Sequence, residues 1–211
     1  FYEPEFAKAH IKYDPERARK LLDAVGLKDV NGDGIRERPD GNPLNVTIEW
    51  LDIEVPRGVT MELVCSHWLE VGIDIKLKQI NRGLQSARAR SNAMQMTIWH
   101  ADRSTDVLFP LLPSWYVPMY ISWDEARWTP WSRWYLSGGE AGEKPPPEAR
   151  ELQVWWDEMR ASTDRARRVE LGKQILRSQA ENLWSIGTVG LAPQPIIVSD
   201  RLNNVPERGY W

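Results

Sequence analysis

The amino-acid sequence predicts an α/β fold, and three patterns in its first half carry that prediction. Residues 44–51 and 73–80 alternate apolar and polar side chains, which is typical of half-buried strands. Residues 58–71, between them, repeat apolar side chains at helical spacing. A strand, a helix and a second strand in this order form a βαβ unit, whose crossover is almost always right-handed. We therefore expect a mixed, mostly parallel sheet flanked by helices.

A helix is expected before the first strand. Asp14 is a good N-cap, and Pro15 fits the first helical position. Apolar side chains at positions 18, 21, 22 and 25 share one stripe, which Gly26 closes. After the βαβ unit, Met94, Met96 and Ile98 indicate a further strand that ends in residues 99–102.

Residues 103–147 have a different character. Proline, glycine and tryptophan are dense there and periodicity is weak, so we expect a long Trp/Pro-rich loop region. Helical periodicity returns at residues 152–159, and Thr163 is the expected cap of a second helix. Residues 186–198 are expected to form extended strands, interrupted by Pro193 and Pro195.

Composition excludes several classes of function. A net charge of −3 gives no electrostatic footprint for nucleic acid. No apolar run approaches the roughly 20 residues of a membrane span. Cys65 is the only cysteine, which excludes an internal disulfide and a cysteine-based zinc site.

The connector between the first helix and the first strand is acidic and has the oxygen spacing of a calcium loop, with Gly34 at the turn. Its candidate ligands are Asp29, Asn31, Asp33, Glu37 and Asp40. An EF-hand continues into a second helix, whereas Pro39 and Pro43 lead into a strand here. Two interpretations stay open: a structural Ca²⁺ site, or a rigid turn in which Asp and Asn accept backbone N–H groups.

The sequence offers little support for an enzyme. The chain has three histidines, and His67 lies only two residues from Cys65, too close on a helix for a facing nucleophile–base pair. His100 stands at a strand end without a Ser or Cys nucleophile placed beside it by any motif. We therefore expect a binding protein without a cofactor, apart from the possible Ca²⁺.

Six stretches, in order, resemble the family 5 extracytoplasmic solute-binding proteins of ABC transporters, the oligopeptide, dipeptide and nickel-binding group. One is Tyr-Asp-Pro-Glu-Arg-Ala with Leu-Leu-Asp-Ala-Val-Gly, and another is Trp-His-Ala-Asp at the third strand end. The stretches are residues 13–26, 33–41, 68–75, 94–102, 163–168 and 203–206.

The resemblance implies a periplasmic-binding-protein-like fold and a fragment of a two-lobed protein. Residues 1–211 would form the single C-terminal α/β lobe, with a loop-rich insertion at 103–147. Residues 195–211 would be directed towards the N-terminal lobe, which is missing from this sequence. The implied function is solute capture outside the cytoplasm, in the periplasm or as a membrane-tethered lipoprotein, and delivery to ABC permease subunits.

The resemblance also implies a site. Asp102 falls where peptide-binding members place the carboxylate that pairs with a ligand's amino terminus. Beside the resemblance, the residues themselves make Trp99 and His100 at the same strand end, and Trp115 in the tryptophan-rich stretch, candidates for the same site. An oligopeptide is the default solute. An oligosaccharide is the alternative, since indoles stack on sugar rings. The tryptophans that would line such a pocket are Trp99, Trp115, Trp123, Trp128, Trp131 and Trp134.

Two features depart from the family pattern. The usual Asp-Pro is missing after Asp102, where residues 103–106 read Arg-Ser-Thr-Asp, and the tryptophan-rich stretch is not typical of peptide binders. Two further readings come from other classes. One is a stand-alone calcium-binding or protein-interaction domain that uses the acidic connector. The other is a glycan-active enzyme.

Overall fold

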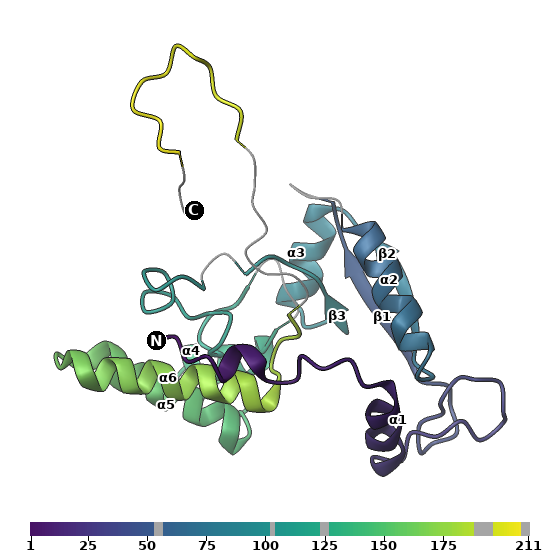
Figure 1. The fold of residues 1–211 in the computed structure, drawn as a ribbon. Helices are drawn as coiled ribbons and strands as arrows, with labels where there is room; N and C mark the ends of the chain where they lie inside the picture. Colours follow the sequence, from purple (N-terminus) through teal and green to yellow (C-terminus); the bar gives the residue numbers. More distant parts are fainter. Residues whose placement is uncertain (53–56, 102–103, 123–126, 188–195, 208–211) are drawn as a thin grey trace.

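The fold is α/β, as predicted, with a small parallel sheet and two groups of helices (Figure 1). The computed structural model describes residues 1–52, 57–101, 104–122, 127–187 and 196–207. Three strands lie in the order β2-β1-β3, and both pairings are parallel. The strands are β1 (Asn45–Trp50), β2 (Asp74–Gln79) and β3 (Met96–Thr97).

The helices fall into two sets along the chain. The first set precedes the loop region: η1 (Phe6–Lys8, a 3-10 helix), α1 (Pro15–Ala24), α2 (Gly58–Leu69) and α3 (Arg82–Arg90), of which η1 packs against α6. The second set follows the loop region: α4 (Thr129–Leu136), α5 (Pro147–Ala161) and α6 (Arg165–Asn182). Helices α5 and α6 lie side by side, joined by a short turn (Figure 1).

The two faces of the sheet differ because strand side chains alternate in direction. On the apolar face, Ile48 and Ile75 pack with Met61 of α2 in a small buried cluster. On the other face, the buried carboxylate of Glu49 accepts hydrogen bonds from Arg88 of α3 (2.6 Å) and from Lys78 (3.3 Å). The sheet is therefore held by an apolar cluster on one side and an ion-pair network on the other.

The larger core lies between α5, α6 and the loop region. Leu152, Leu171 and Ile175 are completely buried there and pack around Phe109 and Val117 of the loop region. The loop is also fixed by polar contacts. The buried Gln153 side chain of α5 donates a hydrogen bond to the Pro118 carbonyl (2.7 Å). Much of the Trp/Pro-rich segment is thus tied to a helical scaffold.

Local signals at the first helix are confirmed. The Asp14 carboxylate accepts a hydrogen bond from the Arg17 backbone N–H (3.0 Å), and Gly26 has a φ of 87° just after the helix. At α6 the predicted cap is wrong by one residue. Asp164, not Thr163, is the N-cap, and its carboxylate accepts from the Ala166 N–H at 2.8 Å.

Other predictions need correction. Helix α3 was not predicted, and α4 shows that residues 103–147 are not irregular throughout. The predicted strands at 186–198 are wrong for the described residues 186–187 and 196–198, which carry no strand; residues 188–195 lie outside the described part. A run of apolar side chains forms a strand only where another strand offers hydrogen bonds.

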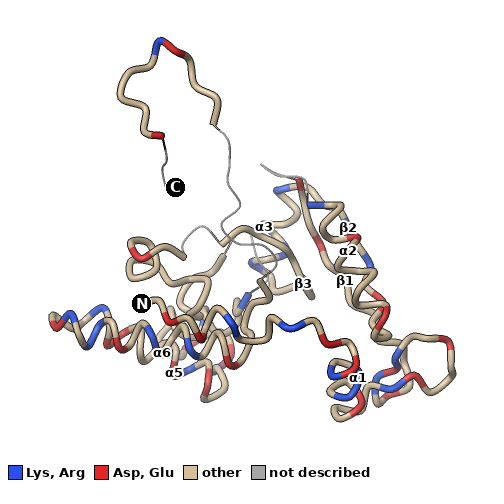
Figure 2. Tube along the Cα trace, in the orientation of Figure 1, with Lys and Arg blue, Asp and Glu red and all other residues tan. Residues whose placement is uncertain are grey.

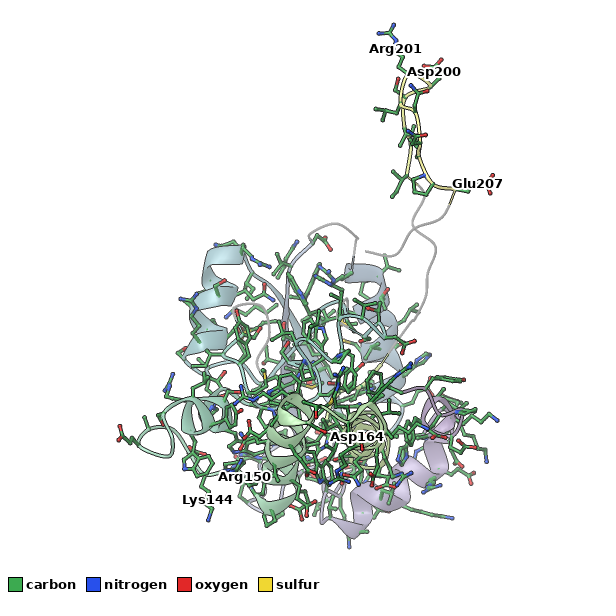
Figure 3. The ribbon with its side chains drawn as sticks, turned by 90° about the vertical axis from the view of Figure 1, so that its left-hand side faces the viewer. Lys144, Arg150, Asp164, Asp200, Arg201 and Glu207 are labelled. Atoms are coloured by element: carbon green, nitrogen blue, oxygen red, sulfur yellow. The ribbon has the colours of Figure 1, made fainter. Side chains whose placement is uncertain are left out.

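The surface carries mixed charge, and Figure 2 shows Lys and Arg interspersed with Asp and Glu along α5 and α6. Among the described helices, none is long and apolar enough to cross a membrane. Residues 196–207 stand away from the rest of the chain, as the positions of Asp200, Arg201 and Glu207 in Figure 3 show. Ile197 in this segment is 98% exposed.

Candidate binding site at the carboxyl edge of the sheet

Three residues from three different strand ends meet at the carboxyl edge of the sheet. Trp99 follows β3, Arg57 immediately precedes α2 in the connection from β1, and Arg82 opens α3 after β2. The guanidinium carbon of Arg57 lies 5.1 Å from the centroid of the Trp99 ring, and that of Arg82 lies 4.8 Å from it. Ligands of open α/β sheets bind beyond the carboxyl ends of the strands, so this position is the expected one.

Arg57 is held firmly in this arrangement. It is only 5% exposed, and its Nη1 donates a hydrogen bond to the Leu51 carbonyl (3.0 Å). Its backbone N–H donates to the Asp52 carboxylate (2.8 Å), which ties the start of α2 to the end of β1. Arg82, in contrast, is exposed. One guanidinium is thus built into the edge, and the other lies at its surface.

Two more aromatic rings extend the edge towards the loop region. The imidazole of His100 lies 4.9 Å from the Trp99 ring, at an interplanar angle of 34°. It also meets the Trp115 indole edge-on, with centroids 6.5 Å apart. The Arg127 guanidinium lies 5.4 Å from the Trp115 ring and donates a hydrogen bond to the Trp115 carbonyl. Trp115 is only 4% exposed.

We call these six side chains the sheet edge: Arg57, Arg82, Trp99, His100, Trp115 and Arg127. It contains three of the four predicted ligand-binding residues. The fourth, Asp102, lies outside the described residues. Indole faces and guanidinium N–H groups suit a solute with flat apolar surfaces and many oxygen acceptors.

The other tryptophans named in the sequence analysis lie elsewhere. Trp128 packs against Trp131 (5.9 Å between centroids) and Trp184 (5.4 Å), beside the helical core. Trp134 lies beneath the Arg150 guanidinium, 5.3 Å away. Trp123 lies outside the described residues. The tryptophan-rich stretch thus contributes mainly to packing on α4 and α5.

Sequence reasoning missed the arginines of the sheet edge. Arg57 directly precedes a predicted helix, and Arg82 directly follows a predicted strand. An arginine in these positions is most often solvated and so gives no signal by itself. The usable signal was topological, since both positions lie at carboxyl ends of parallel strands.

The acidic connector is closed on itself by hydrogen bonds. The Asp29 carboxylate accepts from the N–H groups of the two following glycines (2.7 and 2.9 Å). The Glu37 carboxylate accepts from the Val30 N–H (2.7 Å) and from the Asn31 side-chain amide (2.8 Å). The Asp33 carboxylate accepts from the N–H two residues later (2.8 Å). These bonds are those of a rigid turn.

The structure gathers only part of the predicted calcium set. Oxygens of Asp29, Asp33 and Glu37 lie within 4.8 Å of one another. Asp40 instead pairs with Arg38 (2.8 Å) and accepts from the Asn42 N–H, a hydrogen bond that lowers the pKa of Asp40. Calcium binding stays a hypothesis with three carboxylates rather than four, and the hydrogen bonds favour the structural turn.

Cys65 has the wrong environment for a nucleophile. Burial, followed by the nearby charge of Asp74, raises the pKa of its thiol. A raised pKa keeps the sulfur protonated at neutral pH, whereas a nucleophilic cysteine needs the thiolate. The side chain packs in the cluster around Ile48 and Met61. Its role there is that of a small apolar residue.

A family model matches more than half of the chain. The family described as "Bacterial extracellular solute-binding proteins, family 5 Middle" matches residues 1–118. A curated relative, a periplasmic alpha-galactoside-binding protein of Rhizobium meliloti (strain 1021), is 27% identical over 205 residues. The alignment covers 93% of this chain and 28% of the relative.

Solved structures agree with the fold. An oligopeptide-binding protein OppA is 26% identical with a TM-score of 0.76, over 87% of this chain and 30% of its own. The periplasmic binding protein MelB of Agrobacterium fabrum C58, in complex with stachyose, is 19% identical with a TM-score of 0.70. That match covers 84% of this chain and 26% of MelB. The chain therefore spans about 30% of the length of these relatives.

Proposed function

This chain belongs to the family 5 bacterial extracellular solute-binding proteins, and from this premise we propose that it supplies one wall of a solute site. The whole protein captures a solute outside the cytoplasm and delivers it to ABC permease subunits. The family is one of binding proteins, so the chain is not an enzyme. The observation that carries the proposal is the meeting of Arg57, Arg82 and Trp99 at the sheet edge.

The division of the protein follows from the same premise. Residues 1–211 act as one α/β lobe, and the second wall of the site comes from another part of the whole protein. We propose that residues 195–211, of which 196–207 are described, are directed towards that part, and the exposed apolar side chains of Ile196, Ile197 and Leu202 support this. Binding proceeds by hinge closure, because a solute that touches both walls binds the closed state more tightly than the open one.

We propose an oligosaccharide as the solute. The groups around Trp99 are two guanidiniums and an imidazole, which are N–H donors suited to sugar hydroxyls. An indole supplies the flat apolar surface on which the C–H face of a pyranose ring stacks. The likeness to an alpha-galactoside-binding protein along 93% of the chain supports the same class.

Oligopeptide binding is the second candidate. It is supported by the likeness to an oligopeptide-binding protein at 26% identity and by Asp102, the proposed anchor for a peptide ammonium. The three guanidiniums of the sheet edge, those of Arg57, Arg82 and Arg127, are cationic and disfavour an ammonium beside them. The geometry therefore favours a solute that accepts hydrogen bonds.

The test is calorimetric titration of the full-length protein with stachyose, an α-galactoside, and with trialanine. Trp99→Ala and Asp102→Asn are compared with Trp134→Ala, which removes an indole that contacts Arg150 of α5 and is not among the residues of the sheet edge. We expect stachyose to bind, and Trp99→Ala to weaken it about tenfold or more while Trp134→Ala leaves it unchanged.

Other outcomes decide between the candidates. Trialanine binding that Asp102→Asn abolishes, with no heat from stachyose, would retire the oligosaccharide and establish the peptide. Stachyose binding that survives Trp99→Ala would move the solute away from the sheet edge.

A further inference from the structure

The two arginines beside Trp99 differ in how they are held, and this difference has a consequence for specificity. Arg57 is 5% exposed, whereas Arg82 is exposed at the first position of α3. Both lie within cation–π distance of the same indole, at 5.1 and 4.8 Å. A ring contacted by two guanidiniums loses the freedom to change rotamer.

The start of α2 is packed so tightly that Arg57 has little room to move. A Cβ added at Gly58 would lie 3.1 Å from the Trp50 ring, so the helix begins in direct contact with the end of β1. The Arg57 Nη1 bond to the Leu51 carbonyl (3.0 Å) fixes the guanidinium on the same strand end. The Trp99 indole is therefore oriented by a guanidinium that is itself fixed to the end of β1, the central strand of the sheet.

Arg82 is suited to a different task. Its neighbour Asn81 is the N-cap of α3 and accepts a hydrogen bond from the Leu84 N–H (2.9 Å), which fixes the helix start. The Arg82 side chain then reaches Trp99 from a defined base. A planar guanidinium carries five N–H donors and no acceptor. It matches sugar hydroxyls and carboxylates, and it repels an ammonium.

We propose that Arg57 is a positioning residue for Trp99, and that Arg82 is a specificity-determining residue of the solute site. This inference rests on the proposed function and states which solutes the site would prefer. The pair selects solutes that offer oxygen acceptors beside a flat ring and discriminates against solutes that offer an amine.

The test uses the full-length protein with Arg57→Met, Arg57→Lys, Arg82→Met and Arg82→Lys. Arg17→Met is the matched control, because Arg17 is an exposed arginine in the first turn of α1. Stachyose affinity is measured by calorimetry. The environment of Trp99 is measured by fluorine NMR of fluorotryptophan-labelled protein, in which Trp99→Phe identifies the resonance.

We expect Arg57→Met and Arg82→Met each to weaken stachyose about tenfold and to shift the Trp99 resonance. Lysine should not restore either value, since it lacks the planar fork that stacks on an indole. The same titration is made with an analogue of stachyose in which an amine replaces one hydroxyl. Arg82→Met should reduce the ratio of stachyose affinity to the affinity for this analogue, and Arg17→Met should change neither affinity.

The proposal is overturned if wild-type protein binds stachyose and the four variants match it within about twofold with the Trp99 resonance unmoved. Wild-type stachyose affinity in Arg57→Lys and Arg82→Lys would also overturn the proposal, because a positive charge without the planar guanidinium would then be enough for binding. Failure of wild-type protein to bind stachyose instead overturns the oligosaccharide proposal. The Trp99 resonance then still decides whether Arg57 positions the ring.

Discussion

The sheet region and the helical region of this chain are stabilised in different ways. The sheet region holds two small buried clusters, one around Ile48 and Met61 and one around Ala89 and Met94, together with the Glu49 ion pairs. The helical region holds a cluster of seven, and Leu171 and Ile175 within it are completely buried. The largest buried cluster thus lies in the helical region and not among the strands.

This division fits a binding protein. The helical region supplies a rigid support, since tightly packed interiors deform little. The sheet edge keeps exposed and half-buried polar groups such as Arg82 and His100, which a packed core excludes. His100 and Trp115 meet where the two regions join.

The largest expected effect compares the two cores directly. Leu171→Ala should lower the free energy of unfolding by about 3–5 kcal/mol, because the side chain is completely buried and its removal leaves a cavity that its neighbours cannot fill. Ile75→Ala should cost about 2–3 kcal/mol, since its neighbours are half-buried and can collapse. Urea unfolding of the full-length protein measures both, with the exposed Leu136→Ala as control. A larger loss from Ile75→Ala would reverse the comparison.

A smaller effect is expected from the ion pairs of the sheet. Burial raises the pKa of Glu49, but the hydrogen bonds from Arg88 and Lys78 lower it by more, so it lies below 4.5. Glu49→Gln should cost about 1.5–3 kcal/mol at neutral pH. A depressed folded pKa gives stability that is complete above the unfolded value and is lost as pH falls through the folded one.

The difference in unfolding free energy between wild type and Glu49→Gln should therefore shrink as pH falls below about 4.5. Urea titrations at neutral and acidic pH measure it. A difference that is constant with pH would show that the lost stability comes from packing and not from the charge.

The smallest expected effect on the free energy of unfolding comes from a hydrogen-bonded polar pair in the helical region, the counterpart of the Glu49 ion pairs in the sheet. The Tyr135 hydroxyl donates to the Asp157 carboxylate (2.5 Å), and burial together with this bond raises the pKa of Tyr135 to about 12. Tyr135→Phe should cost about 0.5–1.5 kcal/mol at neutral pH. Tyr13→Phe is the control, since Tyr13 makes a similar bond to Glu70 on the exposed surface.

A raised folded pKa gives stability that is present below the unfolded value of 10.0 and is lost as pH rises through about 12. The cost of Tyr135→Phe should therefore fade in alkaline solution. If Tyr135→Phe and Tyr13→Phe lowered the free energy of unfolding equally, burial would not be the reason that the Tyr135 hydrogen bond is stabilising.

The sequence predicted the sheet region more completely than the helical one. Alternation and helical spacing located β1, α2 and β2, because these elements bury one face and leave the other polar. Helix α3 was not predicted because its buried positions are Gln85 and Ala89, which form no apolar stripe. Helix α4 escaped because its tryptophans and proline resemble a loop.

The site shows the same limit. Trp99, His100 and Trp115 were predicted from their place at a strand end and in the tryptophan-rich stretch, and they do lie together. Arg57 and Arg82 belong to segments far apart in sequence, and only the parallel order of three strands brings them to one indole. No local sequence pattern could have predicted that these side chains contact one another.

The most direct test of this account is a crystal structure of the full-length protein with stachyose. We expect a galactosyl ring in van der Waals contact with Trp99, within about 4 Å, and its hydroxyls accepting hydrogen bonds from Arg82. Stachyose bound elsewhere, with no sugar ring in contact with Trp99, would contradict it.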